Sequence, residues 1–185
     1  MRNLKHFIPT VVLFFAMITW THAAPASSQQ NDKPGIQGYF FVAPSPVYQG
    51  NCVCYRGTSI HFGGGADFLL YKGFGAGAEL GHITAPNEGY FNGLNTRAGI
   101  GLFSANGYYF LLRKRKLSPF GTLGYTLGFG GGQTNFINFG GGANYWINSH
   151  VGLLLEFREY INHKAMLDSH LNTRILSARF GLSFR

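Results

Sequence analysis

Four residues near the C-terminus carry the side chains of a hydrolytic site. His163 precedes the run Asp168-Ser169-His170, and acyl transfer often uses a serine that is activated by a histidine, which a carboxylate in turn orients. Residues that are adjacent in sequence do not easily stack in that order. Hydrolysis is therefore an alternative only, and we expect a protein that is not an enzyme.

The two cysteines, Cys52 and Cys54, lie in a turn-rich stretch at 48–57. Zinc usually takes four protein ligands, so two thiols make a poor metal site. Histidines occur without metal-ligand or catalytic spacing, at strand ends and in connections, where we expect interface or loop residues: His61, His82, His150, His163 and His170. We predict no metal and no cofactor. A strained disulfide within the loop and thiols that stay free or pair between molecules are both open.

The elements that must hold such residues are β-strands. In the run 151–162 every second residue is apolar, as at Val151, Leu153 and Leu155, and the run 135–147 alternates in the same way. A period of two is that of a strand. Only residues 148–150 separate the two runs, so they form a hairpin. Each run is close to the ~9–11 residues that a tilted strand needs to cross a bilayer.

The same alternation predicts eight strands, at 36–44, 57–70, 74–84, 92–112, 119–129, 135–147, 151–162 and 171–185. Their connections alternate in length, because 45–56, 85–91 and 163–170 are longer than 71–73 and 148–150. Outer-membrane barrels alternate long external loops with short periplasmic turns. The sequence therefore predicts an all-β fold, a closed antiparallel transmembrane β-barrel of about eight strands in an up-and-down meander.

The segment 92–112 is too long for one crossing, and it contains Asn106-Gly107, a strong two-residue hairpin signal. Against a turn, the alternation continues in phase through this dipeptide, and the six residues that follow Asn106 up to Leu112 are too few to span a membrane. We favour one long strand, bulged at Asn106. A turn at this position is the alternative.

Each strand has one apolar face and one small or polar face. In the strand at 57–70, Ile60 and Phe62 lie on one face, and Gly63 and Gly65 lie on the other. A face in contact with water would not be paved with glycine, whereas the interior of a narrow barrel leaves little space for side chains. The pattern therefore indicates an inside-out barrel, with apolar side chains toward lipid and small or polar ones toward the lumen.

The polar faces carry three acids and three arginines: Asp67, Glu79, Glu156, Arg97, Arg158 and Arg179. An eight-stranded barrel is filled by its own side chains, and buried charges persist when they are paired. We therefore predict an ion-pair network in the lumen that closes it to conduction. A position near the rims, in contact with water, is the alternative for any one of the six.

Residues 1–23 have the features of a secretory signal peptide: Arg2 and Lys5, an apolar run, and small residues before a cleavage site after Ala23. Residues 24–34 are expected to be a flexible lead-in, and 35–185 the barrel. Loss of Arg2 and Lys5 lowers the formal net charge from +8 to +6.

Charged residues make up 12 % of the chain and aromatic ones 16 %, whereas soluble domains average about 25 % charged residues. These features predict export to the outer membrane of a Gram-negative bacterium.

One block of charge, Arg113-Lys114-Arg115-Lys116, lies in a connection predicted to face the periplasm. Such a block can indicate nucleic-acid binding in a soluble protein, but an exported barrel does not normally meet nucleic acid, and we expect no such partner. Anionic lipid headgroups are one expected partner of this basic turn. A simple solvated turn is the alternative.

With its strands laid out, the chain resembles the small eight-stranded outer-membrane proteins of the OmpA transmembrane-domain and OmpX kind, from about Gly35 to Arg185. The carriers are the runs 119–125, 140–146, 152–158 and 180–185. The resemblance implies contact with outer-membrane lipid and assembly through machinery that reads the C-terminal strand. Members usually end in an aromatic residue, whereas here Phe184 is penultimate and Arg185 follows. Outer-membrane deacylases carry His-x-Ser on a lipid-facing strand, and that motif is absent.

These observations favour a non-enzymatic outer-membrane β-barrel, acting as a monomer, with a structural, adhesive or surface-protective role through its external loops. A small pore is the first alternative, limited by the narrow interior and its charges. A barrel enzyme that acts on lipid A or phospholipid is the second. Loop specificity depends on local shape, so the external ligand is unknown.

Overall fold

The computed structural model describes residues 34–49, 54–84, 99–112, 115–130, 134–162 and 173–185. They belong to the second of the two compact units into which the chain divides, Asp32–Arg185. The predicted signal peptide and all but the last residue of the predicted lead-in lie outside the described residues. In the part of the chain that is described, no helix is long and apolar enough to cross a membrane.

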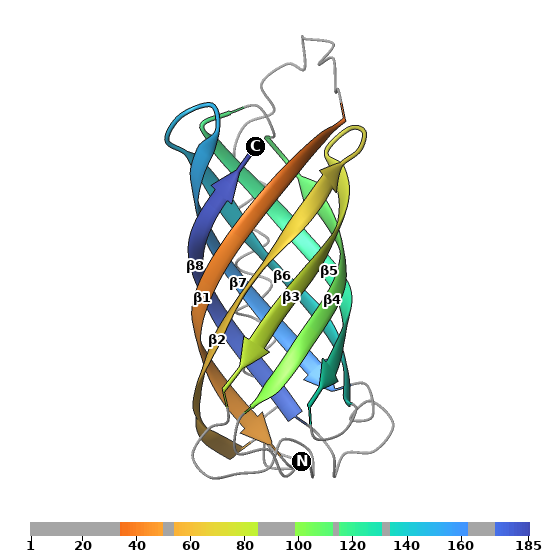
Figure 1. Ribbon diagram of the computed structural model, residues 1–185, viewed down its shortest axis with the longest axis vertical. Helices are drawn as coiled ribbons and strands as arrows, with labels where there is room; N and C mark the ends of the chain where they lie inside the picture. Colours follow the sequence, from red (N-terminus) through yellow and green to blue (C-terminus); the bar gives the residue numbers. More distant parts are fainter. Residues whose placement is uncertain (1–33, 50–53, 85–98, 113–114, 131–133, 163–172) are drawn as a thin grey trace, which may run out of the picture. The chain divides into compact units, whose positions relative to one another are not determined.

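Eight antiparallel strands follow one another around a closed barrel, and β8 pairs with β1 to complete it (Figure 1). The strands are β1 (Gly35–Gln49), β2 (Cys54–Leu69), β3 (Phe74–Ile83), β4 (Ile100–Phe110), β5 (Leu117–Phe129), β6 (Thr134–Trp146), β7 (Val151–Asn162) and β8 (Thr173–Phe184). This confirms the predicted all-β class, the strand number and the up-and-down meander.

The barrel has two different ends. We call the one that holds the start of β1 and the end of β8 the terminal end, and its connections are 70–73, 111–116 and 147–150. The other, the loop end, carries the connections 50–53, 84–99, 130–133 and 163–172. The C-terminus marks the terminal end at the top of Figure 1.

The prediction of a long first connection at 45–56 is wrong, because β1 continues to Gln49 and β2 begins at Cys54. Pro44 and Pro46 lie within β1, although proline has no N–H to donate. Both prolines pair with β2, while the ladder from β1 to β8 is interrupted between Val42 and Val47. A strand therefore tolerates them where one of its two ladders is open.

The prediction of a bulge at Asn106 is also wrong, whereas the preference for a strand over a turn there is correct. The register of β4 with β3 and β5 passes through Asn106 and Gly107 without a shift. The shift lies instead between Val47 and Tyr48, whose partners are Gly57 and Tyr55. Gly57 has φ of 133°, a conformation that favours glycine.

The wall separates side chains by type. Outward positions hold large apolar residues that are exposed, including Leu153, Leu155, Phe157, Phe180 and Leu182. Inward positions hold glycines and polar side chains, with two apolar clusters. β4 turns its even-numbered residues, from Ile100 to Phe110, toward the lumen. In β4 the apolar side chains at even-numbered positions therefore help to fill the interior. In the other strands the apolar side chains at alternate positions mainly cover the outside.

Candidate functional site

Four charged side chains meet inside the barrel at mid-height. Glu79 comes from β3, Glu156 and Arg158 from β7, and Arg179 from β8. Strand alternation turns all four inward, and the β7–β8 register sets Glu156 directly opposite Arg179. Each side chain is at most 2 % exposed. We call these four residues the charged layer.

Each acid of the charged layer meets both arginines. Arg179 binds Glu79 through two parallel hydrogen bonds, Nη2 to Oε1 at 2.7 Å and Nη1 to Oε2 at 2.8 Å. Arg158 lies 2.6 Å from Glu156 and 3.2 Å from Glu79, and Arg179 Nη1 lies 3.2 Å from Glu156 Oε2. Bidentate pairs of this kind combine strength with a fixed geometry. The charges therefore neutralise one another as a unit.

Aromatic residues complete the charged layer. The hydroxyl of Tyr39 donates to Glu79 Oε2 at 2.8 Å. Arg158 Nη2 donates to the hydroxyl of Tyr108 at 3.4 Å, and Arg179 donates to that of Tyr160. The guanidinium of Arg179 also lies 3.9 Å from the centre of the Phe41 ring. These contacts orient the arginines and replace the water that a guanidinium would otherwise bind.

Two apolar clusters lie on either side of the charged layer. The cluster toward the terminal end contains Tyr39, Phe41, Ala43, Leu69, Tyr108, Phe110, Phe120 and Leu154. The cluster toward the loop end contains Val47, Ile83, Ile100, Leu102, Phe136, Tyr160 and Ile175. A water-filled channel would leave the arginines accessible to solvent, but both are fully buried. The described lumen is therefore filled by side chains at this height.

The remaining two predicted lumen charges do not join this layer in the described structure. Asp67 of β2 is buried in the lumen, but no ion pair joins it to an arginine among the described residues. Arg97 lies outside the described residues. Four of the six charges chosen from the sequence are thus brought together.

Most residues of the other predicted sites lie outside the described residues. These are Cys52, Arg113, Lys114, His163, Asp168, Ser169 and His170. The backbone of Cys54 begins β2 and pairs with Gln49. Arg115 and Lys116 lie in the connection at the terminal end, where Lys116 Nζ is 5.1 Å from the centre of the Tyr145 ring. Among the described residues, no three or more His, Cys, Asp or Glu side chains gather in a way that could hold a metal ion.

The sequence interpretation misplaced His61 among interface and loop histidines. It is fully buried in the lumen, with Nδ1 3.2 Å from Ser177 Oγ, which lies 2.6 Å from Ser45 Oγ. Its ring meets that of Phe41 edge-on, with centroids 4.8 Å apart. The alternation in the strand at 57–70 had already put His61 on the same face as Gly63 and Gly65, the face predicted to line the lumen.

A second polar group was not anticipated at all. Asn138 Nδ2 donates to Asn106 Oδ1 at 3.0 Å and to Thr126 Oγ1 at 2.9 Å, and Thr126 contacts Ser104 at 2.8 Å. These hydrogen bonds link β4, β5 and β6 and pair most of the buried polar atoms of the group, although Asn138 Oδ1 has no hydrogen-bond partner. Asn106 thus has a role in packing the lumen that its turn-forming sequence concealed.

No protein-family model and no curated protein matches the sequence. Solved structures do resemble it in fold. Neisserial surface protein A matches with a TM-score of 0.61 at 11 % identity over 82 % of this chain and 98 % of that one. The N-terminal barrel domain of Pseudomonas aeruginosa OprF matches with a TM-score of 0.54 at 11 % identity, over 82 % and 98 % of the two chains.

A designed transmembrane β-barrel is also similar, with a TM-score of 0.54 at 13 % identity over 82 % of this chain and 96 % of the design. At such identities the likeness concerns the fold. It confirms the resemblance to small eight-stranded outer-membrane barrels at that level. A fold by itself does not imply a function.

Proposed function

We propose that this protein is a non-enzymatic β-barrel of a Gram-negative outer membrane that acts through its loop end and does not conduct. One observation carries the proposal: the barrel is inside-out, with buried ion pairs within and large apolar side chains exposed outside. In water this arrangement would be strongly unfavourable, whereas in a bilayer each side chain meets a suitable environment.

The outer wall supports a position in a membrane. Phe40 of β1 is 67 % exposed and Leu123 of β5 is 63 % exposed. Large apolar side chains are thus exposed on different strands of the wall. Tyr71, Tyr109 and Tyr145 are exposed at the terminal end. Such tyrosines occur at membrane interfaces, where the ring lies among lipid tails and the hydroxyl reaches water.

The terminal end is the periplasmic side in this proposal, since barrels of this class keep both termini there. The connections 84–99 and 163–172 are then external and are long enough to take part in structural, adhesive or surface-protective roles. Outer-membrane lipid surrounds the wall. The assembly machinery reads β8, although Arg185 follows its last aromatic residue, Phe184.

The orientation can be tested with matched epitope insertions. One tag is placed in the connection 163–172 and a control tag in the turn at 147–150, and both variants are expressed with the N-terminal region intact. Antibody on intact cells should bind the first tag and reach the second only after the outer membrane is opened. Binding to the turn tag on intact cells would overturn the orientation.

Absence of conduction can be tested in planar bilayers with refolded protein. The parent should show no large steady conductance, because the charged layer and the two apolar clusters fill the lumen. Glu156→Ala leaves both arginines with one acid and should produce transient openings at most. A large steady conductance in the parent that Glu156→Ala leaves unchanged would show an open lumen and favour the pore alternative.

A further inference from the structure

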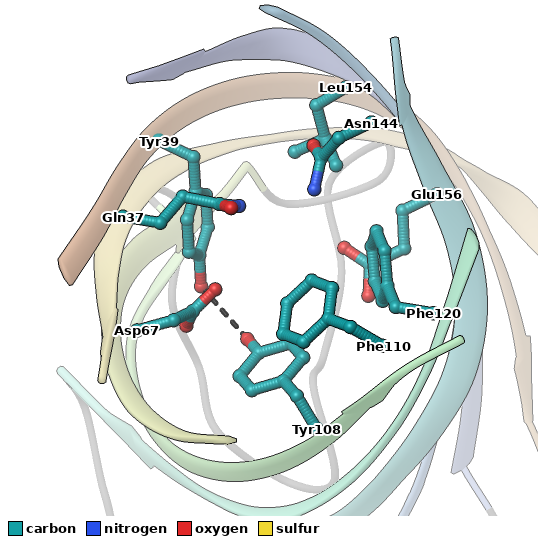
Figure 2. A pocket seen from close by; sticks show the side chains of 9 residues that line it. All are labelled: Gln37, Tyr39, Asp67, Tyr108, Phe110, Phe120, Asn144, Leu154 and Glu156. Carbon is teal, nitrogen blue, oxygen red and sulfur yellow. Dashed lines mark hydrogen bonds between the residues drawn. The ribbon is translucent and has the colours of Figure 1, made fainter. Parts of the chain in front are cut away.

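The lumen contains a small cavity between the charged layer and the terminal end. Figure 2 shows it with the residues that line it: Gln37, Tyr39, Asp67, Tyr108, Phe110, Phe120, Asn144, Leu154 and Glu156. Its volume is about 10 Å³, which is room for about one water-sized particle. Polar groups and aromatic rings are mixed around it, with Asp67 and Gln37 on one side and Glu156 and Asn144 across from them.

Asp67 is the unusual member of this lining. It is only 2 % exposed, and its Oδ1 has no hydrogen-bond partner. In the charged layer, two arginines already balance two glutamates through ion pairs. Among the described lumen residues, the carboxylate of Asp67 therefore adds one negative charge without a matching positive one. A buried carboxylate of this kind is tolerated when it takes up a proton or when a cation compensates its charge.

Most polar groups around Asp67 are oxygen atoms. The guanidinium of Arg158, which donates to the Tyr108 hydroxyl, is already paired with Glu79 and Glu156. Tyr108 bonds its side chain, and the hydroxyls of Tyr39 and Tyr108 are 3.1 Å apart. In Figure 2 the carboxylate lies beside these two hydroxyls and points into the lumen. Gln37 and Glu156 line the same cavity. Oxygen ligands of this type suit hard cations.

The size and the charge of the site restrict the cation. A calcium ion takes 6–8 oxygen ligands, often from several carboxylates, and magnesium retains several waters. The cavity has room for about one particle, and Asp67 is its only carboxylate that is not already ion-paired among the described residues. We propose that this cavity binds one monovalent alkali cation, with Asp67 as its charged ligand.

We expect a cation to enter from the terminal end, past the side chains of the apolar cluster on that side. The charged layer lies on the other side of the cavity, where its arginines repel a cation. In the proposed orientation the ion therefore exchanges with the periplasm, and this clause alone rests on the proposed function. Binding itself depends only on the folded barrel, so it can be tested in detergent whatever the location of the protein in the cell.

The rival occupant is a neutral water molecule. Asn144 Nδ2 is also buried without a hydrogen-bond partner and faces the same cavity, and a water could accept from it while donating to Asp67. Water and cation differ in one measurable property. A site that holds only water does not respond to the identity of the salt, whereas a cation site stabilises the folded state in proportion to its occupancy.

The test is urea unfolding of the refolded barrel in non-ionic detergent at pH 8, with choline chloride exchanged stepwise for NaCl or KCl at constant ionic strength. Choline is too large for the cavity. The unfolding midpoint of the parent should rise with alkali concentration, and that of Asp67→Asn should not. Glu159→Gln removes an acid from the outer face and should keep the response of the parent.

A parent midpoint that does not respond to the exchange would overturn the proposal and favour water. An equal response in Asp67→Asn would overturn it as well. If Asp67→Asn fails to refold, sodium-23 NMR of the parent decides. The folded barrel should broaden the sodium line, and added KCl should narrow it again. No broadening beyond that of empty detergent micelles would overturn the proposal.

Discussion

Strands β7 and β8 carry ion pairs on both of their faces, and the two faces differ greatly. Inside, Glu156 contacts Arg158 and Arg179 at 2.6 and 3.2 Å, with all three side chains at most 2 % exposed. Outside, only three residues further along β7, Glu159 lies 3.8 Å from Arg174, and these side chains are 22 % and 39 % exposed. The same residue types on the same strands thus occupy two different environments.

The difference shows that the side of the strand, more than the residue type, decides what an ion pair contributes. Burial removes water from a charge at a large cost, which only close partners offset. At the exposed pair, water and salt screen most of the attraction. Loss of one partner should therefore be costly within the lumen and nearly neutral outside it.

The largest expected effect is that of Arg179→Ala. It removes two hydrogen bonds from Glu79 and the pairing with Glu156, and should cost about 3–5 kcal/mol of unfolding free energy, as for other broken buried pairs. Urea unfolding of the refolded barrel would measure it. A cost below about 1 kcal/mol, the range of exposed pairs, would show that water enters the charged layer and would remove the contrast between the two faces.

A matched control separates lost pairing from lost volume. Replacing all four residues of the charged layer with Leu or Met removes their four charges together, so that none of the four is left without its partners. Such replacements are often neutral or stabilising. The quadruple variant should therefore be clearly more stable than Arg179→Ala, although it changes more residues.

The next effect tests the outer face. Leu155 lies among the outward apolar residues of β7, and Leu155→Arg should cost about 2–4 kcal/mol in lipid, falling to about 0–1 for the same change near an interface. Ile147→Arg, in the turn at the terminal end, is the control for depth. Equal costs at the two positions would indicate that Leu155 does not face the centre of a bilayer.

A third effect compares glycines on the two faces. A methyl group on Gly124 would lie within 2.5 Å of the Ala105 carbonyl oxygen and would also meet Asn106, whereas one on Gly107 would lie 3.7 Å from its nearest neighbour. Gly124→Ala should cost about 1–3 kcal/mol by overpacking the lumen. Gly107→Ala, on the outer face, should be nearly neutral. If thermal unfolding showed a larger loss of stability for Gly107→Ala than for Gly124→Ala, the faces of β4 and β5 would be wrongly assigned.

The sequence was sufficient for the fold because alternation is a local property. Glu156 and Arg158 are two residues apart on one strand, so a common face follows from the period alone. The closed antiparallel meander followed from the same alternation and from the short connections. The full extent of β1 was not predicted: it includes Pro44 and Pro46, which fit where the ladder to β8 is interrupted, and that interruption is not visible in the sequence.

The partners within the lumen could not be predicted, because they depend on the stagger of strands that are not neighbours. Glu79 of β3 meets Arg179 of β8 across the interior, and no local pattern relates these two positions. Asn106 shows the same limit: alternation already favoured a strand there over a turn, but the hydrogen bond that Asn138 of β6 donates to it did not follow from any local pattern. Local pattern assigned the faces, and the closure of the barrel selected the contacts.

The smallest expected effect belongs to the exposed pair. Arg174→Gln should cost about 0–1 kcal/mol, because the pair is long and partly hydrated. A double-mutant cycle with Glu159→Gln isolates the coupling, and its value should fall as NaCl rises, since screening shortens the reach of exposed charges. A coupling near that of the charged layer, unchanged by salt, would place Glu159 and Arg174 in a water-poor setting. The contrast between the two faces of β7 and β8 would then lie in geometry and not in hydration.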